Sequence, residues 1–299
     1  MMMAKKFMYL ITLPEAFHPS RILLVAWISL CTAQLHAQTY QELIASSAEA
    51  AAQDSLQHAE TLIRRALKLE PANPRNALLF SNLATLQRRQ KKYDLALENY
   101  TYALNIAPRT VPILLNRATL YLEMGKDDAA RADYSLVLDM DPDHAEALAM
   151  RAYIYLRQRD YKFARADYQH LLKQHPSDFN GRLGLATLAQ KEGKFEEAFQ
   201  ILSAMVQEET ESKQFRPETL AMLLVARAGV EKDLKHLDLA LLDLETALHH
   251  HPTLADAYLT RGQIYLSQGK KRLAKTDFEQ AMALGVPQAD MRELISQCR

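Results

Sequence analysis

The chain has few cysteines and few glycines, and each scarcity excludes a class of protein. Of its 299 residues only Cys31 and Cys298 are cysteines, so a disulfide framework cannot be the basis of the fold. Eight glycines are few for a β protein with many tight turns. The motifs GxxxxGK[ST], GxGxxG, CxxC and HExxH are all absent. The sequence therefore supports no catalytic, cofactor or metal site.

The chain also lacks a surplus of charge of either sign. Lys and Arg together number 36, and so do Asp and Glu. A general nucleic-acid binder needs a basic excess to displace counterions, so we expect no nucleic-acid partner. The histidine run 249–251 is the one cluster of metal-ligand type. Adjacent helical residues point in different directions, so we interpret the run as structural.

The N-terminal segment has the order of a secretory signal. Lys5, Lys6 and Arg21 precede the apolar run 22–30, and small residues follow up to Ala37. We expect cleavage after Ala37, removal of residues 1–37, and a periplasmic or secreted mature chain without a stable membrane span. The apolar run is shorter than the roughly twenty residues that a membrane helix requires. Two alternatives stay open, an uncleaved signal anchor and lipidation of Cys31.

Residues 111–178 contain one motif written twice, with matched residues 34 apart. The first copy holds Arg117-Ala118, Ala130-Arg131-Ala132-Asp133-Tyr134 and Pro142, and the second holds Arg151-Ala152, Ala164-Arg165-Ala166-Asp167-Tyr168 and Pro176. A period of about 34 residues is typical of stacked helical hairpins.

This motif resembles the tetratricopeptide repeat, whose hairpin has small residues at three positions and a proline near its end. The resemblance implies an all-α, right-handed superhelical solenoid over residues 38–299. In its frame the expected repeats are 40–73, 77–110, 111–144, 145–178, 179–212, 221–254 and 255–288, followed by a capping helix at 288–297.

Local residue choices fit this frame. Small side chains such as Ala118 and Ala130 let two antiparallel helices approach closely. Glycines are expected at the hairpin turns, where a left-handed residue ends the first helix, and prolines are expected to end the second helix. These residues are Gly125, Gly193, Gly269, Pro142, Pro176 and Pro252. The insertion 207–220 lengthens one link, which is either a hinge or an insertion in a continuous array.

A charge pair recurs inside the repeats. Arg and Asp occupy the same two positions in four repeats and are absent together from others. Antiparallel helices bring these positions close, so we predict Arg–Asp ion pairs within hairpins or to the next hairpin. The pairs are Arg117 with Asp133, Arg151 with Asp167, Arg227 with Asp243, and Arg261 with Asp277.

The resemblance also implies a concave groove lined by the first helices. The candidate partner-binding residues are Asn82, Arg88, Arg89, Leu115, Asn116, Thr119, Leu122, Met150, Tyr153, Leu156 and Arg157, and Leu183, Thr187 and Lys191 extend the same face. This pattern predicts an apolar centre with basic ends, suited to a partner segment with apolar anchors and an acidic flank. The alternative is that tight winding buries this surface between adjacent repeats.

The family resemblance implies a non-catalytic scaffold or adaptor that binds a protein or peptide partner, with no cofactor. Because one fold serves many functions, other roles stay open. The chain could be a structural, self-assembling repeat protein of the cell envelope, or an envelope-anchored lipoprotein that acts in assembly. No sequence feature supports a hydrolytic or carbohydrate-handling role.

Overall fold

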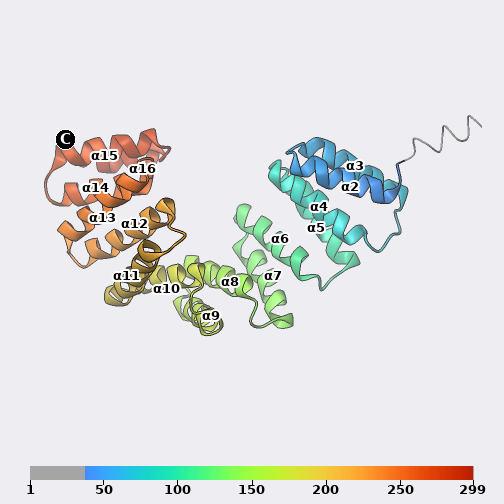
Figure 1. Cartoon of the computed structure of the whole chain (residues 1–299), viewed down its shortest axis with the longest axis horizontal. Helices are drawn as coiled ribbons and strands as arrows, with labels where there is room; N and C mark the ends of the chain where they lie inside the picture. The colour runs from blue at the N-terminus through green and yellow to red at the C-terminus, as the bar shows by residue number, and fades with distance from the viewer. Residues whose placement is uncertain (1–37, 299) are drawn as a thin grey trace, which may run out of the picture. The chain divides into compact units, whose positions relative to one another are not determined.

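A computed structural model describes residues 38–298, and every regular secondary-structure element in this part of the chain is a helix (Figure 1). The helices are α2 (Tyr40–Ala52), α3 (Leu56–Leu69), α4 (Asn76–Arg89), α5 (Tyr93–Ile106), α6 (Val111–Glu123), α7 (Asp127–Met140), α8 (Ala145–Arg157), α9 (Tyr161–Gln174), α10 (Phe179–Lys191), α11 (Phe195–Glu211), α12 (Pro217–Asp233), α13 (Leu237–His250), α14 (Ala255–Ser267), α15 (Lys271–Ala283) and α16 (Gln288–Gln297). The all-α repeat fold is confirmed. The predicted signal, including Cys31 and Ala37, lies outside the described residues.

The chain divides into two compact units, one ending at Pro108 and the other beginning at Arg109. In the first unit α2 pairs with α3 and α4 pairs with α5. In the second unit the pairs are α6 with α7, α8 with α9, α10 with α11, α12 with α13, and α14 with α15. The last helix, α16, packs against α15 and buries Met291 beside Phe278. Each hairpin is one repeat, so the helices occupy the frame that the sequence spacing indicates.

Prolines set where the second helices end. The helices α7, α9 and α13 each end two residues before a proline, at Pro142, Pro176 and Pro252. The residue before a proline is disfavoured in the helical region, and Asp141 accordingly has φ −137° and ψ 90°. The repeat without a closing proline behaves differently. Its second helix, α11, continues for 17 residues to Glu211.

The 207–220 insertion is mostly helical. It lengthens the end of α11 and the start of α12, and each of these helices has 17 residues. Met205 and Val206 of α11 pack in one core cluster with Leu220 and Leu224 of α12. The division between the compact units falls elsewhere, between Pro108 and Arg109. The link is therefore mostly helical and packed within one compact unit.

The hairpin turns use a left-handed residue at one equivalent position. Gly125, Gly193 and Gly269 have φ values of 70°, 76° and 72° there, as the sequence predicts. Asp54, Lys91, Arg159 and Lys235 hold the same position in the other hairpins, with φ between 58° and 66°. The turn geometry is therefore imposed by the repeat even where the residue is not glycine.

The Arg–Asp pairs are confirmed in all four repeats. Each guanidinium donates from Nε and Nη2 to the two carboxylate oxygens, at distances between 2.7 and 2.9 Å. All four aspartates are buried. Arg151 also donates to Ser135 Oγ of the preceding repeat at 3.2 Å. The pairs therefore fix the register of the two helices within a hairpin.

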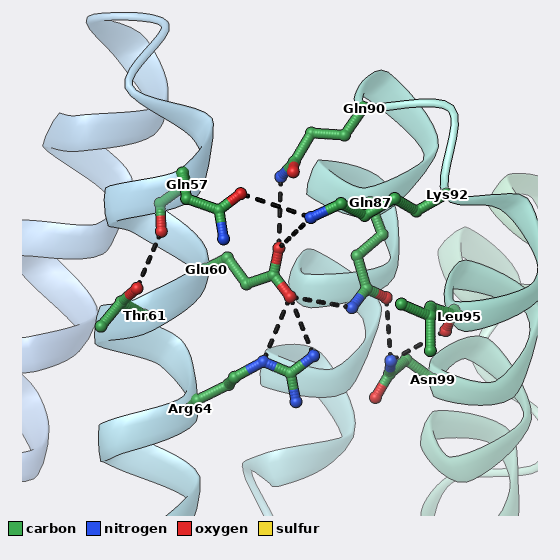
Figure 2. A network of polar contacts seen from close by, with 9 residues as sticks. All are labelled: Gln57, Glu60, Thr61, Arg64, Gln87, Gln90, Lys92, Leu95 and Asn99. Carbon is green, nitrogen blue, oxygen red and sulfur yellow. Dashed lines mark hydrogen bonds and ion pairs between the residues drawn. The ribbon is translucent and has the colours of Figure 1, made fainter.

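A hydrogen-bonded network that includes the neutral pair Gln87 and Asn99 replaces this ion pair in the repeat formed by α4 and α5 (Figure 2). Gln87 accepts a hydrogen bond from Asn99 at 2.9 Å and donates one to Glu60 of the preceding repeat at 3.1 Å. Arg64 donates to the same Glu60 oxygen at 2.8 Å, and Lys92 lies 3.4 Å from the other. Burial favours a raised pKa for Glu60, but the bonds from Arg64 and Gln87 outweigh it and lower the pKa. The network thus joins repeats one and two.

Candidate functional site

A hollow opens between the first helices of two adjacent repeats, α8 and α10, with a residue of α9 beneath it. Its volume is about 330 Å³. The lining side chains are Ala149, Met150, Tyr153 and Leu156 of α8, Tyr168 of α9, and Asn180, Leu183, Gly184 and Thr187 of α10. Most of them are apolar and none is charged, which is the composition typical of a recognition pocket.

The absence of a side chain at Gly184 makes room for Tyr168. A Cβ atom at Gly184 would lie 2.3 Å from Cζ and 2.5 Å from the hydroxyl oxygen of Tyr168. No real side chain tolerates such a distance, so the glycine lets the phenol ring reach the backbone of α10. The tip of a second-helix tyrosine is thereby brought to a first-helix surface.

The Tyr168 hydroxyl differs in its hydrogen bonding from the equivalent hydroxyl of repeat two, that of Tyr100. There the hydroxyl of Tyr100 lies 2.8 Å from Thr85 Oγ1, within its own repeat. In repeat four the position of Thr85 is taken by Tyr153. Tyr168 as a whole residue is only 3% exposed, its side chain lines the hollow, and none of the hydrogen bonds found within residues 38–298 involves its hydroxyl.

Burial, followed by the nearby Tyr153 and Asp167, raises the pKa of Tyr168. The phenol is therefore protonated at neutral pH and can donate a hydrogen bond.

The hydroxyl of Thr187, the threonine that lines the hollow, is already hydrogen-bonded. Thr187 Oγ1 donates to Leu183 O of its own helix at 2.9 Å. Thr119 on α6 does the same with Leu115 O at 2.9 Å. A threonine bonded in this way adds little polarity to its surface. The free polar groups at the hollow are consequently the Tyr168 hydroxyl, the exposed Asn180 and the half-exposed Tyr153.

The structure brings together only some of the candidate residues predicted from the sequence. Met150, Tyr153 and Leu156 line the hollow, together with Leu183 and Thr187. Leu115, Asn116, Thr119 and Leu122 lie half-buried on α6 and do not line it. Asn82, Arg88 and Arg89 lie on α4, in the other compact unit. The hollow therefore includes only some of the residues predicted to line the groove.

Two of the basic residues at the predicted ends of the groove, Arg157 and Arg89, have acidic partners. Arg157 Nη1 lies 3.2 Å from Asp127 Oδ1, and its guanidinium stands 5.8 Å from the centre of the Tyr153 ring. Arg89 Nη2 lies 2.7 Å from Asp54 Oδ1. These pairs weaken the case for basic ends that attract an acidic flank. They join consecutive hairpins, so the 34-residue frame alone does not reveal them.

Four lining residues were missed by sequence reasoning, namely Ala149, Tyr168, Asn180 and Gly184. Tyr168 has equivalent tyrosines, Tyr100 and Tyr134, in repeats two and three, so its position in the repeat does not distinguish it as part of a site. The signal that could have found it is Gly184, a glycine within a first helix where its neighbours have larger residues.

Within the described range no cluster of three or more His, Cys, Asp or Glu side chains could hold a metal ion. The same range contains no helix that is both long enough and apolar enough to cross a membrane. Cys298 is a free thiol whose Sγ lies 3.3 Å from Leu294 O.

Seven consecutive hairpins with a shared turn conformation define a helical-repeat protein. Models of the tetratricopeptide repeat match residues 87–154, 150–212 and 255–284. A tetratricopeptide repeat protein from Parabacteroides merdae ATCC 43184 is 32% identical, with a TM-score of 0.77 over 88% of this chain and 99% of that chain. The chain belongs to the tetratricopeptide repeat family.

Two further solved structures share the fold at lower identity. PilW, a widely conserved type IV pilus biogenesis factor, is 20% identical, with a TM-score of 0.61 over 74% of this chain and 97% of that chain. PilF of Pseudomonas aeruginosa is 17% identical, with a TM-score of 0.57 over 73% of this chain and 94% of that chain. The comparison with curated proteins gives no match. Repeats of this family typically form non-catalytic scaffolds for protein interaction or assembly.

Proposed function

We propose that this chain is an adaptor that binds a segment of a partner protein on its first-helix surface, centred on the hollow between α8 and α10. The observation that carries the proposal is the hollow itself, which combines apolar walls with a lining tyrosine, Tyr168, whose hydroxyl takes part in none of the hydrogen bonds found within residues 38–298. Concave apolar sites with a few polar groups are where proteins bind ligands. The half-buried Leu115 and Leu122 on α6 offer further apolar contacts in the same compact unit.

The test is affinity capture with two matched double variants. Leu115→Glu with Tyr153→Ala changes the first-helix surface. Leu239→Glu with Leu242→Ala changes two exposed leucines of α13, which are 52% and 60% exposed. The full chain and both variants are used as bait in extracts of the source cells, and retained proteins are identified by mass spectrometry.

The proposal expects a partner that the chain and the α13 variant retain and that the first-helix variant loses. Equal retention by both variants would overturn it, provided that circular dichroism shows both to be folded. Retention of a second copy of this chain alone would favour the self-assembling alternative.

We also propose that the adaptor acts after export. Two observations support this. Residues 5–37 contain basic residues, an apolar run and small residues in the order of a secretory signal, and the first helix of the described chain, α2, begins at Tyr40. Thr39 caps this helix. Its Oγ1 accepts a hydrogen bond from the Glu42 backbone N–H at 3.2 Å, and the Thr39 backbone N–H donates to Glu42 Oε2 at 2.8 Å. Cleavage after Ala37 would leave this cap whole. N-terminal sequencing of the protein from an envelope fraction should begin at Gln38. A lipidated Cys31 or an intact Met1 in that fraction would contradict cleavage after Ala37 but not export. Recovery of the chain from the cytoplasmic fraction alone would contradict export.

A further inference from the structure

We infer that the hollow recognises an extended, uncharged stretch of a partner protein, with one large apolar side chain inside it and a carbonyl oxygen bonded to the Tyr168 hydroxyl. This inference rests on the proposed function and specifies the chemistry of its ligand. It follows from three properties of the hollow, which are its size, its lack of charged lining side chains and the available hydroxyl of Tyr168.

The size of the hollow suits a single anchoring side chain. Its volume of about 330 Å³ is at the lower end of the roughly 300–1,000 Å³ of small-ligand pockets. The walls are formed by Met150 and Leu156 on one side and by Leu183 on the other. Methionine and leucine walls adapt to aliphatic or aromatic groups, so burial of apolar surface supplies most of the affinity.

The electrostatics of the hollow exclude a charged anchor. No lining side chain carries a charge, so a charged group would lose its hydration without gaining a counter-ion. Two ionised side chains close to lining residues are already paired. Arg157, beside Tyr153, pairs with Asp127 at 3.2 Å, and Asp167, beside Tyr168, pairs with Arg151 at 2.8 Å. The segment that enters the hollow must therefore be uncharged.

The Tyr168 hydroxyl supplies the directional contact. It is protonated, it belongs to a side chain that lines the hollow, and none of the hydrogen bonds found within residues 38–298 involves it, so it is available to a ligand acceptor. The backbone carbonyl is the acceptor that every peptide carries. In the interior of a helix the carbonyls are already bonded to the helix's own amides, whereas an extended segment leaves them free. An extended stretch fits this donor best.

The experiment selects peptides from a library of random heptapeptides displayed on phage, with the full chain as the target. Peptides that also bind Leu183→Arg, in which a charged side chain fills the hollow, are removed. Enriched peptides are synthesised, and their dissociation constants are measured by fluorescence anisotropy. The two variants compared are Tyr168→Phe and Tyr102→Phe. Tyr102 is an exposed tyrosine of α5 whose hydroxyl donates to Glu98 at 2.9 Å.

Enriched peptides should share one large aliphatic or aromatic residue with no charged neighbour. They should bind Tyr168→Phe about 3- to 10-fold more weakly, because one hydrogen bond to the ligand is lost, and should bind Tyr102→Phe unchanged. Since none of the hydrogen bonds found within residues 38–298 involves the Tyr168 hydroxyl, Tyr168→Phe should not lower the melting temperature.

Three results would overturn the inference. These are no enrichment over Leu183→Arg, a charged consensus, or equal binding to Tyr168→Phe and the full chain. None of them contradicts the proposed function, which fails only if the first-helix variant retains the captured partner. The two failures are therefore distinguishable.

Discussion

Arg151 and Asp167 are joined by two hydrogen bonds, of 2.8 and 2.9 Å, across the two helices of one hairpin. The side chain of Asp167 is about 10% exposed, whereas that of Arg151 is about 22% exposed. Hydrogen bonding to Asp167 raises the pKa of Arg151 above its ordinary value, despite the opposing effect of burial. Because Ser135 also accepts from Arg151, the pair links two consecutive repeats as well as two helices.

Removing one partner of this ion pair should destabilise the fold more than replacing both partners with apolar residues. We predict that Arg151→Met lowers the free energy of unfolding by about 3–5 kcal/mol, because Asp167 is left as a buried, unpaired charge. The double variant Arg151→Met with Asp167→Leu should recover most of that loss. Urea unfolding followed by circular dichroism measures both.

An exposed ion pair provides the control. Lys275 and Glu279 are 3.7 Å apart and both more than half exposed. Lys275→Met should change the free energy of unfolding by less than about 0.5 kcal/mol. If Arg151→Met were equally mild, the pair would not be fixing the hairpin.

The turns offer a test in which two substitutions have opposite effects. Gly125 and Arg159 hold equivalent left-handed positions, with φ of 70° and 64°. A Cβ at Gly125 meets nothing within 4 Å, so Gly125→Ala should cost about 1 kcal/mol through backbone strain alone. Arg159→Gly should stabilise the protein by about 0.5–1 kcal/mol. Thermal unfolding measures both.

The neighbouring turn residue is the control, because Lys126 has an ordinary φ of −93°. Lys126→Gly should bring no stabilisation. A gain there equal to that of Arg159→Gly would show that the effect does not come from the left-handed conformation.

Glu231 should make stability depend on pH. It occupies the position of Tyr121, Tyr155 and Tyr265 in other repeats. Its Oε2 is buried without a hydrogen-bond partner in the described part of the chain. Burial and the nearby Asp243 raise its pKa to about 7 from an ordinary value of 4.5, against the opposing charge of Arg227.

The folded state therefore keeps a proton on Glu231 that the unfolded chain releases near pH 4.5. Stability should fall as pH rises from about 4.5 to about 7, by on the order of 3 kcal/mol for this group alone. Glu231→Gln should abolish this component of the fall while leaving stability at pH 4 nearly unchanged. Urea unfolding across pH 4–8 measures it, and parallel curves for the protein and the variant would contradict the assignment.

The repeat frame could be predicted from sequence because its determinants are local and periodic. Prolines at fixed spacing end the second helices, and the 16-residue separation of Arg117 and Asp133 places them face to face across one hairpin. Neither inference requires knowledge of how one repeat packs against the next.

The contacts between repeats could not be predicted in the same way. Gln87 substitutes for the charge pair from a different position of its repeat, and its partner Glu60 belongs to the preceding hairpin. Arg157 likewise pairs with Asp127 of the preceding hairpin. The hollow depends on Tyr168 meeting Gly184 of the following repeat. Each case depends on side-chain direction at a repeat junction, which the 34-residue period does not encode.

Site-specific photocrosslinking tests the central claim, that a partner protein binds at this hollow, most directly. A benzoylphenylalanine placed at Tyr153, a lining residue that is 43% exposed, is compared in the source cells with one at Leu242 of α13. The account predicts a crosslinked partner protein of defined mass from Tyr153 and none of that mass from Leu242. No crosslink from Tyr153, or the same products from both positions, would contradict it.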